Sequence, residues 1–175
     1  MITMTTAVAA AVLIGRIYIG LAVAAHGVGK LFGWFGGYGL KGTGAAFETF
    51  GFRGGTMFAL AAGLSETGGG LLTAFGLLGP LGPATIVMIM LVAIFSVHAG
   101  NGFLAEKRGF ELPGTYASGA LILAYIGAGP YSLDAAFGLS WLTRPDFSNW
   151  ALAGAVLLTV INLLARRRPV PAPVH

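Results

Sequence analysis

Three ionisable side chains interrupt the first long apolar stretch of the chain. The segment from Gly15 to Gly37 reads GRIYIGLAVAAHGVGKLFGWFGG and carries Arg16, His26 and Lys30. At about 100° per residue, these three side chains fall within an arc of roughly 80° on a helix. Ionisable groups cost free energy in hydrocarbon and usually face a bundle interior or a water-filled cavity. We therefore expect other helices to cover this face.

The outer part of this face has a candidate partner in the next apolar segment. At about 1.5 Å per residue, Arg16 and Glu66 come out at roughly the same depth in antiparallel helices. Neither charge is tolerable alone in hydrocarbon, so a structural Arg16–Glu66 ion pair is the first expectation. A layer that takes part in small-molecule or ion transport is the alternative.

The inner part of the face points to different chemistry. His26 matches the depth of His98, and Asn101 lies one helical turn further along the same face as His98. With Lys30 these residues form a candidate cofactor-binding group. The histidines could pack by hydrogen bonds alone, ligate a metal or haem, or donate a hydrogen bond to a quinone carbonyl. Two histidines without a third certain ligand are a weak indication of a metal.

The composition defines the class of protein. Of the 175 residues, 56% are hydrophobic and only 9% are charged, with a mean hydropathy of +0.83. Soluble domains carry about a quarter charged residues, so this is a membrane protein in contact with the lipid bilayer. The net charge of +4 is no nucleic-acid signature, because three basic residues form the run 166–168 after an apolar segment. The absence of cysteine excludes disulfide, dithiol and thiolate iron–sulfur chemistry.

Five apolar segments predict an all-α integral membrane protein. They cover about Ala7–Phe32, Thr56–Leu78, Ala84–Leu104, Thr115–Gly129 and Trp150–Ala165. A span needs about 20 residues. The fifth segment reaches that length only if Phe147 to Trp150 belong to it, and could otherwise lie in the interface.

The placement of lysine and arginine predicts the orientation. With five spans and a cytoplasmic C-terminus, eight basic residues fall on the inner side and only Arg144 falls in an outer loop. The N-terminus is then outside. On the inner side, Leu40–Phe52 has the pattern of a short amphipathic surface helix. The tail Pro169–His175 is Pro-rich.

An ordered series of motifs resembles the DoxX family of small membrane proteins. The series is HGVGKLFGWFGG, GLKGT, LSETGGGLLTAFGLL, MLVAIFSVHAGNGF and GPYSLD, and the resemblance covers nearly all of Gly15 to Gly138. The resemblance implies a four-helix transmembrane bundle over residues 1–137, an additional C-terminal transmembrane helix over 138–165 and a basic, Pro-rich cytoplasmic tail over 166–175. The closing motif of the family falls on Tyr131, Ser132 and Asp134.

The resemblance also sets the functional expectation. It implies a membrane subunit of a respiratory or oxidative-stress oxidoreductase complex in a bacterial or archaeal inner membrane, with other subunits as partners. A quinone or haem near His26 and His98 is then the expected cofactor, and a homo-oligomer is possible. The alternative is a non-enzymatic scaffold that recruits or stabilises partner proteins. The family's likeness to vitamin K epoxide reductase supplies no mechanism, because this chain lacks the cysteine pair.

Overall fold

The computed structural model describes residues 4–167, and these form helices and turns without a strand. The prediction of an all-helical protein is confirmed. The residues before and after this range, including Arg168 and the Pro-rich tail, lie outside the described part. The α-helices are α1 (Thr6–Phe32), α2 (Gly39–Thr49), α3 (Gly55–Phe75), α4 (Leu81–Ala93), α5 (Glu111–Ile126), α6 (Leu133–Ala136) and α7 (Pro145–Ala165). The short turns are η1 (Trp34–Gly36), η2 (Ile94–His98, π-helical), η3 (Ala99–Asn101), η4 (Ala105–Lys107) and η5 (Ser140–Thr143).

Three of these helices are long and apolar enough to cross a membrane. They are α1, the continuous helix Leu81–Asn101 that contains α4, and α7. Helix α7 begins at Pro145, so Phe147–Trp150 belong to it and its 21 residues reach the required length. Helix α5 has only 16 residues. Helix α3 has 21, but Glu66 and its glycines reduce its apolarity. The structure thus shows an all-helical fold with three candidate spans, and the four-helix transmembrane bundle with an additional span stays a prediction.

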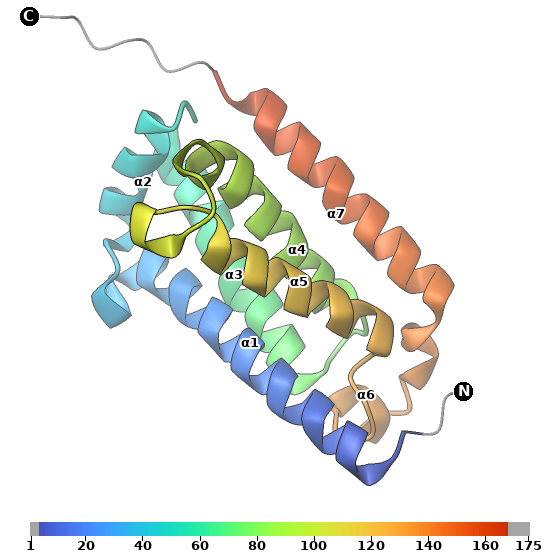
Figure 1. Ribbon diagram of the computed structural model, residues 1–175. Helices are drawn as coiled ribbons and strands as arrows, with labels where there is room; N and C mark the ends of the chain where they lie inside the picture. Colours follow the sequence, from blue (N-terminus) through green and yellow to red (C-terminus); the bar gives the residue numbers. More distant parts are fainter. Residues whose placement is uncertain (1–3, 168–175) are drawn as a thin grey trace, which may run out of the picture.

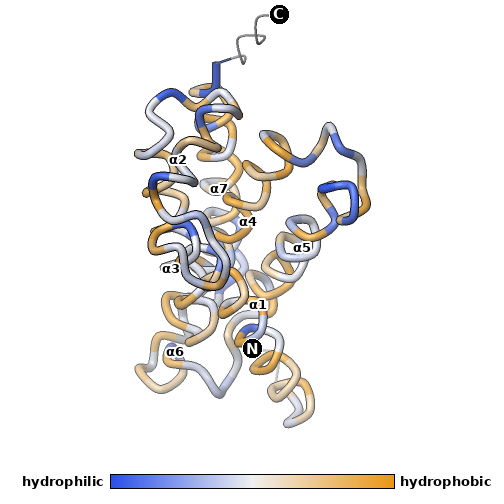
Figure 2. The backbone as a smooth tube through the Cα atoms, turned by 90° about the vertical axis from the view of Figure 1, so that its left-hand side faces the viewer, coloured by the Kyte–Doolittle hydropathy of each residue, from blue (hydrophilic) through white to orange (hydrophobic). Residues whose placement is uncertain are grey.

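The long helices pack side by side in an alternating up-and-down order (Figure 1). Helix α1 contacts α3, α3 contacts α4, α4 contacts α5, and α5 returns to α1. Helix α7 lies along α4. We call the end with α2 and the last residues of α7 the α2 end, and the opposite end the α6 end. Figure 2 shows that most of the hydrophilic residues lie at the α2 end.

Glycines determine how α1 and α3 align. A Cβ atom on Gly20 would lie 2.5 Å from the carbonyl oxygen of Gly70, and one on Gly27 would lie 2.5 Å from the amide nitrogen of Thr67. Only glycine permits so close a backbone approach. These contacts place Gly20 beside Gly70 and Gly27 beside Thr67, so Arg16 lies beyond Gly70, towards the end of α3. Glu66 lies near Gly27.

The C-terminal helix is fastened to the rest of the fold along its length. Ser148 donates a hydrogen bond of 2.7 Å to the carbonyl of Ala124 on α5. Thr159 donates one of 3.3 Å to the carbonyl of Met88 on α4. Beyond the helix, the amide of Arg167 donates to the carbonyl of Gly51 at 2.9 Å. The segment 138–165, predicted as an additional helix, is therefore hydrogen-bonded to helices α4 and α5.

Candidate functional site

The acidic residue of the bundle is paired with lysine. Lys30 Nζ donates to Glu66 Oε2 at 2.5 Å, and the Glu66 side chain is 5% exposed. The predicted Arg16–Glu66 pair is therefore wrong. The depth estimate aligned the ends of the first two long helices, whereas the glycine contacts between α1 and α3 bring Glu66 to the level of Gly27. Lys30, less than one turn further along α1, is then the cation within reach.

The two terminal nitrogens of the Arg16 guanidinium donate to backbone carbonyls near the α6 end. Arg16 is 3% exposed, and its guanidinium donates to the carbonyl oxygens of Ala74 and Tyr131. Ala74 lies in the last turn of α3, where unpaired carbonyls carry partial negative charge. The Nε atom of Arg16 is buried without a partner. Arg16 therefore ties the end of α3 to the loop after α5.

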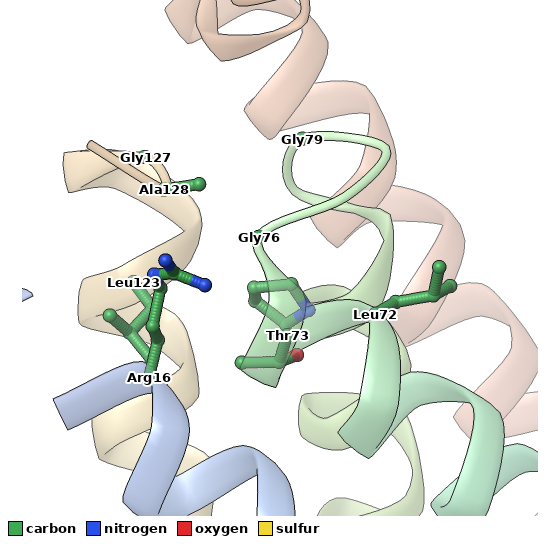
Figure 3. Close-up of a pocket in the computed structure, with 9 residues that line it drawn as sticks. Arg16, Leu72, Thr73, Gly76, Gly79, Leu123, Gly127 and Ala128 are labelled. Carbon is green, nitrogen blue, oxygen red and sulfur yellow. The ribbon is translucent and has the colours of Figure 1, made fainter. Parts of the chain in front are cut away.

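A small cavity lies beside Arg16, between the ends of α3 and α5 (Figure 3). Its lining includes Thr73, Gly76 and Gly127, and its volume is about 10 Å³. A volume of this size holds about one water molecule. The cavity is therefore no substrate pocket.

The closing motif reinforces the same end of the molecule. Asp134 is 1% exposed, and its carboxylate accepts hydrogen bonds from the amides of Leu78 at 2.9 Å and Gly79 at 2.6 Å. Ser132 caps α6 by accepting from the amide of Ala135 at 3.2 Å. Tyr131 contributes its carbonyl to Arg16. These contacts hold the α3–α4 connection in place, so their observed role is structural.

His98 and Asn101 fold back onto the loop that follows them. His98 Nδ1 lies 2.7 Å from the carbonyl oxygen of Arg108, and Asn101 Nδ2 donates to that oxygen at 3.2 Å. Arg108 has a left-handed backbone with φ of +58°, so these hydrogen bonds fix a tight turn. Within residues 4–167 neither a hydrogen bond nor a ring contact joins His26 to His98. The predicted inner group is therefore split between α1 and this loop.

His26 lies on the seam between α1 and α5. Its side chain is exposed, and its ring meets the Tyr116 ring edge-on at 6.1 Å between centroids. Lys30 stands one turn along α1, with its charge directed to Glu66. The sequence reasoning missed Tyr116. Its position in the short fourth apolar segment was visible, but the pairing of α5 with α1 was not.

The described residues hold no metal centre of the usual kind. Nowhere in the range 4–167 do three His, Asp or Glu side chains gather closely enough to hold an ion. The arrangement therefore offers one accessible imidazole at the α1–α5 seam, flanked by a phenol, rather than a ligand cluster.

The three candidate spans and the buried contacts of Glu66, Arg16 and Asp134 define a multi-pass membrane protein with ionic and polar groups between its helices. The chain belongs to the DoxX family, whose model matches residues 11–99, just over half of the chain. The match includes His26, Lys30, Glu66 and His98, and ends before the closing motif.

One curated relative is an uncharacterized protein of Haemophilus influenzae, 37% identical over 60 residues. The alignment covers 34% of this chain and 40% of that protein. No solved structure matches the chain.

Proposed function

We propose that this protein is a quinone-binding membrane subunit of an oxidoreductase complex, with the quinone headgroup at His26. The observation that carries the proposal is the exposed imidazole of His26 on the α1–α5 seam. Arg16, Glu66, His98 and Asp134 have hydrogen-bond or ionic partners within the chain. Among residues 4–167, His26 has a ring contact with Tyr116 and no hydrogen bond, so its nitrogens can meet a ligand.

The residues around His26 fit a quinone headgroup. A neutral imidazole carries one N–H, which can donate to a quinone carbonyl. The Tyr116 ring supplies a flat apolar wall beside the imidazole. A bound quinone would supply electron-carrying capacity, while His26 would orient the headgroup. Haem ligated by both histidines is less well supported, since His98 is engaged with the Arg108 carbonyl in a different segment.

Replacing His26 by phenylalanine is expected to weaken quinone binding about tenfold. The variant keeps an aromatic edge against Tyr116 and removes the ring N–H, and a net hydrogen bond contributes about 1 to 1.5 kcal/mol. The full chain in detergent is titrated with a short-chain ubiquinone and a short-chain menaquinone analogue by tryptophan fluorescence. His98→Ala is the matched control and should bind like wild type. Equal binding by His26→Phe and wild type would reject His26 as the site.

A non-enzymatic scaffold is the second candidate, and the contacts that the buried charged residues make within the chain favour it. The ion pair Lys30–Glu66, the Arg16 contacts and the Asp134 contacts all stabilise helix packing. Helix α2 exposes Lys41 and Glu48, which supply a polar surface for a partner. A wild-type protein that binds neither quinone analogue in the same titration would favour this candidate.

We also propose that the α2 end faces the cytoplasm and that α3 and α5 cross the bilayer. Basic residues in loops favour the cytoplasmic side, and Lys41, Arg53, Lys107 and Arg108 belong to connections at the α2 end. Both helices run between the same two ends as the three candidate spans.

Reporter fusions test this orientation. Fusions of alkaline phosphatase and a fluorescent protein after residue 175 should give fluorescence without phosphatase activity. Fusions after Gly138 should give the reverse, since that residue follows α6. Phosphatase activity from the C-terminal fusion would show that the orientation is inverted.

A further inference from the structure

Two segments that together carry three arginines meet at the α2 end, although 113 positions separate Arg53 from Arg166 in the chain. The backbone amide of Arg167 donates to the carbonyl of Gly51 at 2.9 Å, and Arg53 follows Gly51 by two residues. Gly51 has a φ of +94°, and a Cβ there would meet the Arg166 side chain and the Arg167 carbonyl. We call Arg53, Arg166 and Arg167 the arginine cluster.

The charges of the cluster are not neutralised by ion pairs within the described residues. The ion pairs formed by residues 4–167 are Lys30–Glu66 and Arg144–Asp146. Arg53 and Arg167 are exposed. Glu48, an exposed residue near the end of α2, packs towards Gly55 and is the acidic residue close in sequence to this loop. The three guanidinium groups outnumber it, so the surface carries net positive charge.

Arg166 shapes the cluster rather than adding a free charge. Its guanidinium donates to the carbonyls of Phe50 and Phe95, the latter at 3.3 Å. Phe50 precedes Arg53 by three residues, and Phe95 lies in the π-helical turn after α4. Arg166 thereby fixes the end of α7, which carries Arg167, against the loop that carries Arg53.

An exposed apolar surface adjoins the cluster. Leu164 is 79% exposed and Ile161 is 51% exposed on the last turns of α7, and Phe95 is 58% exposed on the neighbouring segment. Helix α7 is a candidate membrane span that ends at Ala165, so the cluster begins where the hydrocarbon ends. Positive charge next to exposed apolar side chains complements an anionic lipid, which has a negatively charged headgroup and apolar acyl chains.

We propose that the arginine cluster binds the phosphate headgroup of an anionic phospholipid, whose acyl chains lie along the exposed face of α7. Guanidinium groups bind phosphate oxygens by paired, charge-assisted hydrogen bonds. Basic groups between transmembrane helices attract anionic headgroups at the membrane surface. The proposal is independent of the quinone site, which lies on the α1–α5 seam.

The test compares phosphatidylglycerol with phosphatidylcholine on the full chain in neutral detergent, with bound lipid counted by native mass spectrometry. Wild type should retain phosphatidylglycerol in preference to phosphatidylcholine. Arg53→Gln with Arg167→Gln should weaken phosphatidylglycerol binding roughly 25-fold, about fivefold for each arginine near the surface. Arg166 is left intact because its hydrogen bonds hold the loop.

The matched control removes the same charge from another loop of the α2 end. Lys107→Gln with Arg108→Gln should bind phosphatidylglycerol like wild type, and circular dichroism should show equal helix content in all three proteins. If both double variants bind phosphatidylglycerol equally weakly, the lipid responds to the total surface charge and not to a specific site, and the proposal is overturned. Wild-type binding by the Arg53/Arg167 variant would also overturn it, and would favour an acidic protein segment as the occupant.

Discussion

Replacing Gly20 by alanine is expected to lower the free energy of unfolding by about 3 kcal/mol, the upper end of the usual cost of overpacking. The added Cβ would lie 2.5 Å from the Gly70 carbonyl oxygen and 2.6 Å from the Ala74 amide nitrogen. Both obstacles are backbone atoms of α3, so no side-chain rotation can relieve the clash. The helices must separate, and the hydrogen bond from Arg16 to the Ala74 carbonyl is then lost as well. Unfolding by sodium dodecyl sulfate in mixed micelles, followed by tryptophan fluorescence, measures the change.

Gly15→Ala is the control for this prediction. A Cβ at Gly15 has no neighbour within 4 Å, and the residue lies on the same helix five positions earlier. Alanine is the better helix former, so this variant should be as stable as wild type or slightly more stable. A Gly20→Ala protein with wild-type stability would contradict the close approach of α1 and α3.

Lys30→Met is expected to destabilise the protein by about 3 kcal/mol, because it leaves a buried carboxylate without its cation. Glu66 is 5% exposed in its side chain and lies in the middle of α3, so its carboxylate is largely shielded from water. Glu66→Gln should cost less. The remaining Lys30 is 27% exposed and lies in the last turn of α1, where a long side chain can extend to the interface.

The double variant Lys30→Met with Glu66→Leu distinguishes the contribution of the ion pair to stability from that of side-chain packing. Removing both charges together should recover most of the stability lost in Lys30→Met, since a buried pair is often no better than apolar side chains of similar size. The same unfolding measurement applies. Additive losses in the double variant would show that the two side chains do not depend on each other. Arg16→Met serves as a comparison. Arg16 donates to main-chain carbonyls and not to Glu66, so Glu66→Leu should not recover the stability that Arg16→Met loses.

These results bear on function because they assign roles within the polar face of α1. If Lys30 and Glu66 behave as a structural pair, His26 remains as the ionisable residue on the polar face of α1 that forms no hydrogen bond or ion pair within residues 4–167. Quinone binding that survives the double variant but fails in His26→Phe would locate the ligand at the α1–α5 seam. The arginine cluster lies at the α2 end and should be insensitive to all of these changes.

The sequence alone determined the class of the protein and the identity of its polar residues. Long apolar runs with few charges indicate a helical membrane protein, because a helix forms the hydrogen bonds of its backbone groups within the segment itself when it lies in lipid. The motif series also identified the family, which the match over residues 11–99 confirms. That Arg16, Lys30 and Glu66 would need partners inside the bundle followed from the cost of charge in hydrocarbon.

Only the tertiary structure decided which partners they have. Depth along a helix follows from counting residues, but the offset between two helices follows from where their backbones can approach. In this protein the approach occurs at Gly20, Gly27 and Gly70, which moves Glu66 away from Arg16 and towards Lys30. The hydrogen-bond partners of Arg16 are main-chain carbonyls, which every residue possesses and no sequence pattern marks. The hydrogen bond between Arg167 and Gly51, which brings the loop of Arg53 to the end of α7, likewise depends on long-range packing without a local signal in the sequence.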